Sequence, residues 1–403
     1  MAAPLRIFIV AGEASGDRLG AALMAGLLET YAGPIKFEGI GGPMMIAQGL
    51  TSQFPMHELS LFGLLELIPK WRHLKKRLAQ TVKAVIASQP DILLTIDSPG
   101  FCLRLSAAVR GKITAPAVHY VAPTVWAWRP ERAKKMVAHV DHVLALLPFE
   151  PPYMEAAGMS CDFVGHPVVA EAIPSKSEVL AFRSKHGLGE NDRLITILPG
   201  SRISEIKRLS RIFFATALRV QKQIPLVKFV IPVASAHLLE PLKIQLERAR
   251  LSAILLTPDA AAGTDFAHEK RVCFSASELA LAASGTVSIE LAAAGVPMVI
   301  GYKVNFISGW IMKRAMLAPS FTLVNLLTET SAVPEFHSGA CNSENLSREL
   351  LLLLTDSAKR DEQIAMGQKA IDALGRGGEN PGIRAARSVL ASCGKTPENP
   401  PGV

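Results

Sequence analysis

The chain has 403 residues, of which 49% are hydrophobic and 19% are charged. This composition provides apolar material for two or three domain cores, and it excludes a disordered chain, a collagen-like fibre and a disulfide-stapled mini-protein. Because 43 Lys and Arg outnumber 35 Asp and Glu, the formal net charge is +8. Such an excess suits an anionic partner: a phosphorylated metabolite, a nucleic acid or an acidic membrane surface.

Short apolar runs alternate with Gly/Ser/Pro loops and amphipathic helices, which predicts an α/β fold of parallel strands covered on both faces. The predicted strands are 6–11, 92–96, 118–121 and 143–147, then 194–198, 227–233, 279–283 and 298–301. Because the pattern occurs twice, we expect two Rossmann-like, doubly wound domains. Their predicted limits are 1–170 and 171–365, followed by a C-terminal helix and frayed tail at 366–403.

The segment 279–302 carries one charge, Glu290, and is nominally long enough to span a membrane. However, Gly285, Gly295 and Pro297 divide it into short pieces. We therefore predict a buried strand, a helix and a second strand.

The cysteines and histidines form no metal-binding pattern. The five cysteines are widely spaced without a CxxC pair, which predicts reduced thiols in a cytosolic protein. His139 and His142 have no further ligand nearby in the sequence, so we expect no metal site. The N-terminal apolar run leads directly into Glu13 and Asp17, so we expect no signal peptide.

Ligands of doubly wound sheets bind beyond the carboxyl ends of the strands, so the loops that follow the predicted strands are the candidate sites. The first loop, AGEASGD (11–17), has Gly12 and Gly16 for close backbone approach to an anionic or hydroxylic ligand at a helix start. A tight turn capped by Ser15 and Asp17 is the open alternative. The loop is not GxGxxG, so we expect no nicotinamide cofactor.

Two further loops of the first domain carry candidate residues. Asp97 follows an uncharged strand in TIDSPGF and is placed as a general base, with a helix cap as the alternative. The segment HYVAPTVWAWRP brings Trp126, Trp128 and Arg129 within four positions. This grouping favours a shaped wall facing a ligand or the other domain over ordinary core packing.

Two loops of the second domain suggest a nucleotide site. In LPGSR, Ser201, Arg202 and the amides of the following helix form a candidate diphosphate cradle that lacks the Lys of a Walker loop. In SGTVSIE, Ser284, Gly285 and Thr286 precede a helix on which Glu290 could accept two ribose hydroxyls. An ordinary capped turn and an exposed Glu are the alternatives.

These stretches together resemble the lipid-A-disaccharide synthases, bacterial glycosyltransferases with two Rossmann-like domains. The resemblance covers about residues 5–330 in family order. The matching stretches are AGEASGD (11–17), GIGGPMM (39–45), ELSLFGLLEL (58–67), IDSPGF (96–101), HYVAPTVWAWRPERAKK (119–135), LLPFEPPYM (146–154), FVGHP (163–167), LPGSR (198–202), SGTVSIELA (284–292) and PMVIGYK (297–303).

The resemblance implies a GT-B type fold with a central cleft and transfer of 2,3-diacylglucosamine from UDP to 2,3-diacylglucosamine 1-phosphate. The products would be UDP and a β-1,6-linked disaccharide 1-phosphate of lipid A and lipopolysaccharide biosynthesis. It implies that Asp97 is a candidate base, that Arg202 is functionally important, and that Glu290 and the Ser284–Thr286 turn belong to the nucleotide site. Asn325, in VNLLT, matches a family segment in which Val324 replaces the usual proline. The resemblance also implies a cytoplasmic location at the inner membrane, where the acylated acceptor resides.

One departure concerns the base. The family commonly has D-x-P-D-F where this chain has D-S-P-G-F, so Gly100 stands at the second acid. Either that acid is dispensable or Asp97 carries the carboxylate role alone, and Glu13 and Asp17 remain rival bases. No DxD occurs in the sequence, so we expect an inverting transfer without metal or cofactor, in which helix starts and cations stabilise the departing UDP.

Two alternative functions stay open at this stage: a UDP-sugar 2-epimerase or another UDP-sugar transferase, and a binding protein without turnover. For the oligomeric state, a homodimer stays open. A nucleic-acid binder is not expected because basic residues are dispersed. The segment 61–86 mixes apolar and basic residues, which favours peripheral contact with an anionic membrane surface over a soluble-substrate enzyme. A helix with a solvated basic face is the alternative.

Overall fold

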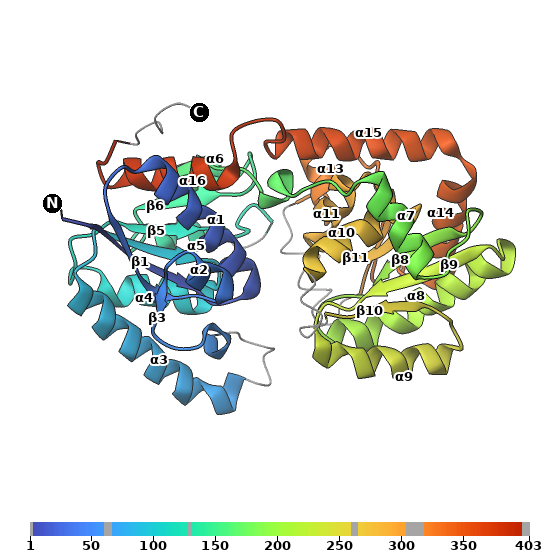
Figure 1. Cartoon of the computed structure of the whole chain (residues 1–403), viewed down its shortest axis with the longest axis horizontal. Helices are drawn as coiled ribbons and strands as arrows, with labels where there is room; N and C mark the ends of the chain where they lie inside the picture. The colour runs from blue at the N-terminus through green and yellow to red at the C-terminus, as the bar shows by residue number, and fades with distance from the viewer. Residues whose placement is uncertain (1–2, 60–66, 128–129, 259–264, 304–317, 397–403) are drawn as a thin grey trace. The chain divides into compact units, whose positions relative to one another are not determined.

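The computed structural model describes residues 3–59, 67–127, 130–258, 265–303 and 318–396 (Figure 1). The chain divides into two compact units: unit 1 is Met1–Ala170 with Leu374–Val403, and unit 2 is Glu171–Ala373. Each unit contains one parallel sheet with helices on its faces. The predicted α/β class with two Rossmann-like domains is therefore confirmed.

The sheet of unit 1 has seven parallel strands in the order β3-β2-β1-β4-β5-β6-β7. The strands are β1 (Leu5–Ala11), β2 (Ile35–Ile40), β3 (Thr51–Ser52), β4 (Ile92–Ile96), β5 (Ala117–Tyr120), β6 (His142–Ala145) and β7 (Ser160–Phe163). The chain adds β2 and β3 on one side of β1 and the later strands on the other. The strand order therefore reverses between β1 and β4, where doubly wound folds bind ligands.

The helices of unit 1 cover both faces of this sheet. They are α1 (Ala14–Thr30), α2 (Pro43–Ala47), α3 (Leu67–Ser88), α4 (Pro99–Val109), α5 (Glu131–Met136), α6 (Pro151–Glu155) and α16 (Pro381–Ser392), with short 3-10 turns η1 (Met56–Leu59) and η2 (Pro167–Ala170). Alternate residues of β1 separate the two cores: Ile7 and Ile9 pack with α1 and α16, whereas Phe8 and Val10 pack with α3 and α4. The period-two side-chain alternation of a strand explains this division.

The sheet of unit 2 has six parallel strands in the order β10-β9-β8-β11-β12-β13. The strands are β8 (Arg193–Leu198), β9 (Val227–Pro232), β10 (Ile254–Leu256), β11 (Leu279–Ala283), β12 (Met298–Tyr302) and β13 (Glu335–His337). Here the order reverses between β8 and β11. Each unit thus has one reversal point between its two central strands.

The helices of unit 2 follow the same arrangement. They are α7 (Lys176–Lys185), α8 (Ile203–Gln223), α9 (Leu239–Ala249), α10 (Phe266–Ala276), α11 (Val287–Ala293), α13 (Leu323–Thr328), α14 (Ser343–Thr355) and α15 (Ser357–Ala373), with the 3-10 turn η3 (Ala236–Leu238). The apolar stripe of α8 is buried at Ile206, Leu209, Phe213, Ala217 and Val220. These side chains pack with β8, β9 and α14 in one core.

All eight predicted strands are present, with ends within two residues of the prediction. The segment 279–302 forms β11, α11 and β12, so the predicted strand–helix–strand unit is confirmed. Sequence analysis missed five strands: β2, β3, β7, β10 and β13. Within the described residues, no helix combines the length and the apolar content that crossing a bilayer requires. All five cysteines are free thiols.

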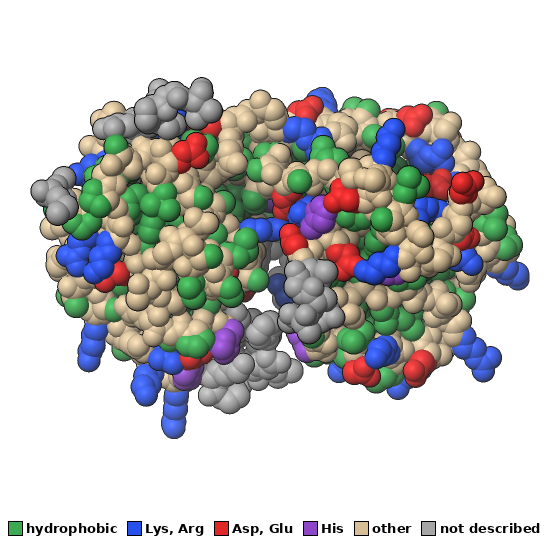
Figure 2. All heavy atoms as spheres, viewed as in Figure 1, with side chains coloured by type: hydrophobic (Ala, Val, Ile, Leu, Met, Phe, Trp, Pro, Cys, Tyr) green, Lys and Arg blue, Asp and Glu red, His purple; other side chains and the backbone are tan. Residues whose placement is uncertain are grey.

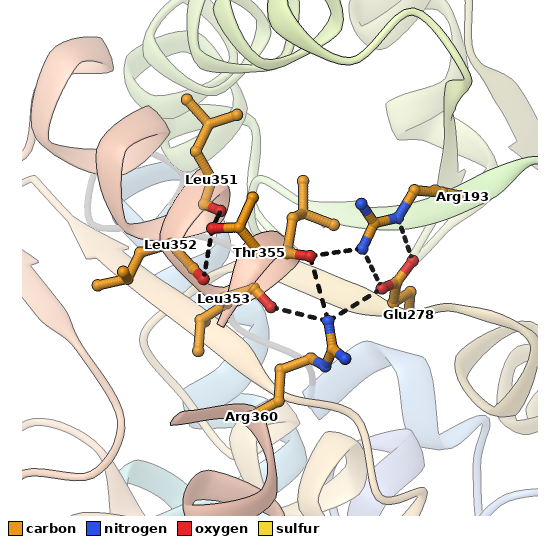
Figure 3. Close-up of polar contacts among 8 residues, drawn as sticks. Arg193, Glu278, Leu351, Leu352, Leu353, Thr355 and Arg360 are labelled. Carbon is orange, nitrogen blue, oxygen red and sulfur yellow. Dashed lines mark hydrogen bonds and ion pairs between the residues drawn. The ribbon is translucent and has the colours of Figure 1, made fainter. Parts of the chain in front are cut away.

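Carboxylates fix the central strand pairs at their amino ends. In unit 2, Glu278 directly precedes β11, and both of its oxygens pair with the guanidinium of Arg193 at the start of β8 (Figure 3). Arg193 also donates to the carbonyl of Leu354 at the end of α14, and Arg360 of α15 donates to the carbonyls of Leu353 and Leu354. In unit 1, Asp91 precedes β4 and accepts the Arg6 amide of β1 at 2.8 Å.

The C-terminal helix α16 packs on α1 in unit 1 at close range. A Cβ placed on Gly26 of α1 would lie 2.4 Å from the Gly382 carbonyl oxygen, and one placed on Gly382 would lie 2.5 Å from that of Ala22. His142 of β6 also contacts Ser388 of α16 at 2.7 Å. The expected third segment, 366–403, is therefore divided: its first residues end α15 in unit 2, and the remainder completes unit 1.

We expect Gly26→Ala to lower the free energy of unfolding of unit 1. An exposed helical Gly→Ala change stabilises a helix by about 1 kcal/mol, but here the methyl group meets backbone atoms, and such overpacking costs roughly 1–3 kcal/mol. Urea unfolding followed by circular dichroism measures the difference. Gly339→Ala is the matched control because a Cβ there meets nothing within 4 Å. An unchanged midpoint in Gly26→Ala would contradict the close helix contact.

Candidate functional site

The reversal point of unit 1 brings together the loops that follow β1 and β4. Ala11 and Ile96 are paired in register at the ends of these strands, so Gly12 and Asp97 leave the sheet side by side. A Cβ on Gly12 would lie 2.4 Å from the Ser98 hydroxyl oxygen. A side chain at position 12 would therefore have to displace the Ser98 hydroxyl.

Asp97 occupies a strained backbone position at this edge. Its φ is +48° and that of Ser98 is +43°, so two consecutive non-glycine residues adopt the left-handed region, which is uncommon and costs free energy. The Asp97 amide donates to the Tyr120 carbonyl of β5 at 2.9 Å. The side chain is half-buried, and burial raises the pKa of Asp97 above its ordinary value.

The other acids of the first loop differ from Asp97. Glu13 precedes α1, and its side chain and that of Ser15 are exposed, whereas Gly16 packs on Ala11. Asp17 is 4% exposed. Its oxygens accept the amides of Gly42, Met44 and Met45 at 2.9–3.0 Å. Asp17 thus holds the start of α2 rather than the turn at α1 that we had considered.

Trp126 lies in the loop that follows β5. Its indole Nε1 donates to Glu150 Oε1 at 3.2 Å, and its ring meets that of Phe149 edge-on at a centroid distance of 5.1 Å. The predicted partners Trp128 and Arg129 lie outside the described residues.

The reversal point of unit 2 brings together the loops that follow β8 and β11. Gly200 has φ +121°, and Arg202 precedes α8. The Arg202 side chain is 75% exposed and lies 3.3 Å from the Glu205 carboxylate, which also accepts the Ser201 amide at 2.9 Å. Glu205 of the first turn of α8 therefore occupies the Ser201 amide in this structure.

The loop after β11 presents small polar groups at the same edge. The Ser284 hydroxyl donates to the Phe321 carbonyl at 3.0 Å, and Gly285 adjoins open space. Thr286 precedes α11, on which Glu290 pairs with Lys270 of α10 at 2.5 Å. The acid on this helix is therefore paired with a lysine.

Asn325 is 3% exposed on α13. Its amide nitrogen donates to the Val333 carbonyl at 2.9 Å, and its oxygen accepts the Val333 amide at 3.0 Å. Both ends of the side chain therefore join α13 to the segment that enters β13.

Sequence analysis missed three charged residues at these loops: Glu150, Glu205 and Lys270. Glu205 lies three residues after Arg202 in the run SRISE, and a first-turn acid in an α-helix was the available signal. Glu150 and Lys270 contact residues 24 and 20 positions away, so no local pattern marks them. Within the described residues, no group of three or more metal-ligating side chains is present.

Solved structures of UDP-sugar 2-epimerases have the same fold. The chain aligns over 99% of its length with a putative UDP-N-acetylglucosamine 2-epimerase from Listeria monocytogenes, covering 99% of that chain, at 14% identity and a TM-score of 0.63. A UDP-GlcNAc 2-epimerase from Neisseria meningitidis bound to UDP-GlcNAc aligns over 96% of this chain and 98% of its own, at 14% identity and a TM-score of 0.62. At these identities the likeness shows the fold alone.

Curated relatives are far more similar in sequence. The chain is 49% identical over 386 residues to the lipid-A-disaccharide synthase of Ruegeria pomeroyi, which covers 96% of this chain and 95% of the relative. It is 43% identical over 388 residues to that of Rhodospirillum centenum, with 96% and 94% covered. The family model described as lipid-A-disaccharide synthetase matches residues 7–387.

Proposed function

Because the chain belongs to the lipid-A-disaccharide synthase family, a family of glycosyltransferases, we propose that unit 2 binds the nucleotide sugar and unit 1 activates the acceptor. The substrates are UDP-2,3-diacylglucosamine and 2,3-diacylglucosamine 1-phosphate, and the products are UDP and the β-1,6-linked disaccharide 1-phosphate. The match over residues 7–387 carries this proposal. It disfavours the 2-epimerase alternative, which rests on fold alone.

The diphosphate binds at the loops that follow β8 and β11. Arg202 is exposed and only loosely paired with Glu205, so its guanidinium can turn to a phosphate oxygen and form a charge-assisted hydrogen bond. Glu205 meanwhile keeps the Gly200–Ser201 turn in place through the Ser201 amide. The start of the 21-residue helix α8 adds a favourable field for the negative charge.

The ribose binds at Glu290. Lys270 holds one carboxylate oxygen of Glu290 at 2.5 Å, which keeps the group oriented. A carboxylate can accept from two adjacent hydroxyls, and this suits a ribose diol. Ser284, Gly285 and Thr286 line the same loop, and Asn325 positions α13 beside it through Val333.

Asp97 is the general base. It accepts the proton from the C6 hydroxyl of the acceptor while that oxygen bonds to the anomeric carbon of the donor from the side opposite the leaving group. The bond from the anomeric carbon to the phosphate oxygen breaks, UDP leaves, and the configuration inverts. The raised pKa of the half-buried Asp97 carboxyl suits a proton acceptor near neutral pH.

The neighbouring acids fit this role less well. Asp17 is unsuitable because backbone amides occupy its oxygens, whereas Glu13 is exposed at the same edge and remains the rival. Gly100 lies exposed in the first turn of α4, so this turn offers no second carboxylate beside Asp97.

Stabilisation of UDP requires no metal in this proposal. The sequence lacks DxD, the carboxylate pattern that would hold a divalent ion on a diphosphate. Arg202 and the start of α8 supply the positive field instead.

The enzyme works at the cytoplasmic face of the inner membrane through α3. The exposed face of this helix carries Arg72, Lys76 and Lys83, and Leu74 and Val85 are buried on the other face. Figure 2 shows Lys and Arg side chains projecting over this part of unit 1. The residues 61–66 of the predicted membrane segment lie outside the described residues. Arg77 pairs with Glu58 at 2.6 Å and so anchors α3.

Purified protein should convert the two substrates to disaccharide and UDP, and Asp97→Asn should lose most of this turnover. A general base typically contributes roughly 10²–10⁴-fold, and the loss should appear in kcat while UDP affinity is retained. Because the pKa of Asp97 is raised, activity should fall as the pH drops below that pKa and the base becomes protonated. Glu29→Gln, an exposed acid on α1, is the control. Near-full activity in Asp97→Asn with collapse in Glu13→Gln would move the role to Glu13.

Arg202→Ala should weaken UDP binding and turnover by roughly tenfold to a hundredfold, the worth of one hydrogen bond to a charged group. Arg219→Ala, an exposed arginine near the other end of α8, should change neither.

Excess EDTA should leave the rate of the unmodified enzyme unchanged. Restoration of EDTA-treated enzyme by Mg²⁺ alone would disprove the metal-independent mechanism.

Replacing Arg72, Lys76 and Lys83 together with Ser should weaken binding to vesicles containing an anionic phospholipid. Each basic residue near such a surface contributes about 1 kcal/mol, so partitioning should fall roughly a hundredfold at low salt. Added salt should weaken the unmodified protein similarly. The control variant replaces Arg219, Lys222 and Lys228, which are exposed in unit 2. Equal vesicle binding by both variants would show that the basic face of α3 is exposed to solvent without binding the membrane.

A further inference from the structure

A buried carboxylate that takes no part in the proposed reaction lies at the carboxyl edge of the unit 1 sheet. Glu150 directly precedes α6 and is 3% exposed. Its Oε2 accepts the amides of Leu146 and Leu147 at 3.1 and 3.0 Å, in the turn that follows β6. Its Oε1 accepts the indole N–H of Trp126 at 3.2 Å. Two strands' loops are thereby joined by one side chain.

The loop that Glu150 holds is connected at its other end to the proposed base. Residues 121–127 follow β5, whose last residue, Tyr120, accepts the Asp97 amide through its carbonyl at 2.9 Å. Val121 has φ +82°, a conformation that a β-branched residue adopts only where its surroundings enforce it. Trp126 lies near the end of this loop and packs edge-on against Phe149. The residue before the loop is therefore hydrogen-bonded to the Asp97 amide, and Glu150 holds the loop near its end.

We propose that Glu150 is a positioning residue that, in its ionised form, latches Trp126 and so holds the loop 121–127 beside Asp97 for binding of the lipid acceptor. This inference rests on the proposed function, in which unit 1 receives the acceptor. Glu150 exchanges no proton with the substrate. Its effect reaches the acceptor through the indole and the loop backbone.

The charge state of Glu150 follows from its surroundings. Burial raises its pKa to about 7, and the hydrogen bonds from Leu147, Trp126 and Leu146 oppose this. The Cys161 thiol of β7 faces it, and burial first, then the negative charges of Glu150, Asp162 and Glu155, raise the pKa of that thiol to about 12. The pKa of Glu150 is thus set by its burial and by these three hydrogen bonds.

Protonation weakens the latch. An ionised carboxylate is an acceptor at both oxygens and can serve all three N–H donors, whereas a protonated one places its own O–H on one oxygen. No acceptor for that proton is among the hydrogen-bonding partners of Glu150 in the described structure. Binding of the lipid acceptor substrate should therefore strengthen as the pH rises through about 7.

Glu150→Gln and Trp126→Phe test the latch from its two sides. With its oxygen kept on the Leu146 and Leu147 amides, the Gln side chain turns its NH₂ toward the indole N–H, so two donors face each other. Trp126→Phe removes the indole donor but leaves every backbone contact of Glu150, so it keeps the proposal testable if the Gln variant folds poorly. Each variant should raise the acceptor KM roughly tenfold, with UDP affinity unchanged. The double variant should be no worse than either single one, because both remove the same contact.

The pH dependence separates this role from general packing. In the unmodified enzyme, kcat/KM for the acceptor should rise through a limb near pH 7 that both variants lack, while the limb set by Asp97 remains. A readout independent of turnover is tryptophan fluorescence: the difference between unmodified protein and Trp126→Phe should titrate near pH 7, and Glu150→Gln should abolish that titration. Glu155→Gln, an exposed acid on α6, is the matched control.

Additive losses in the double variant, an acceptor KM unaffected by Glu150→Gln, or a fluorescence titration that survives this substitution would each overturn the latch. If the fluorescence titrates as expected but no disaccharide forms from the substrates, the proposed function fails and the contact stands. If disaccharide forms and the fluorescence does not titrate, the function stands and the latch fails.

Discussion

Both candidate sites depend on a carboxylate at the opposite edge of the sheet. Parallel strands have no hairpin to set their register, and a slip of one residue would turn every side chain to the wrong face. In unit 2, the two-oxygen contact of Glu278 with Arg193 fixes β8 against β11 (Figure 3). In unit 1, Asp91 does the same for β4 and β1 through the Arg6 amide. Because the amino ends are fixed, the loops at the carboxyl ends meet in a defined arrangement.

The carboxyl groups of this protein differ in pKa because their surroundings differ, and these differences match their proposed roles. Glu58 is half-buried and hydrogen-bonded to Arg77, which lowers its pKa to about 2 and leaves it an ion-pair partner. Asp97 and Glu150 are instead withdrawn from water beside the loops of unit 1, and burial raises the pKa of both. Groups with raised pKa values gather where a proton must move or a charge must respond to pH. In the proposed mechanism, Asp97 moves the proton and Glu150 responds to pH.

The sequence predicted the parts of this protein that depend on local patterns. Apolar runs located the central strands, and the loops that follow them contained Asp97, Arg202 and Glu290. The rest depends on pairing between distant segments. The sequence position of Asp17 suggested a cap of its own turn, yet its carboxylate accepts amides 25 to 28 residues away. Asn325 likewise joins Val333 instead of leaving its amide for a ligand. The short strands β3, β10 and β13 have two or three residues each, too few for a detectable period.

The return of α16 to unit 1 determines the order in which the two units can be completed as the ribosome makes the chain. Unit 2 is one continuous stretch, so all of its strands have been synthesised by residue 373. Unit 1 must wait, because the face of α1 around Gly26 is covered by residues of α16, which are made after all of unit 2. Until then Leu23 and Leu27, fully buried in the finished protein, lack part of their packing. The N-terminal half of the chain therefore finishes folding after the half that follows it, the reverse of the usual N-terminal-first order of domain folding during synthesis.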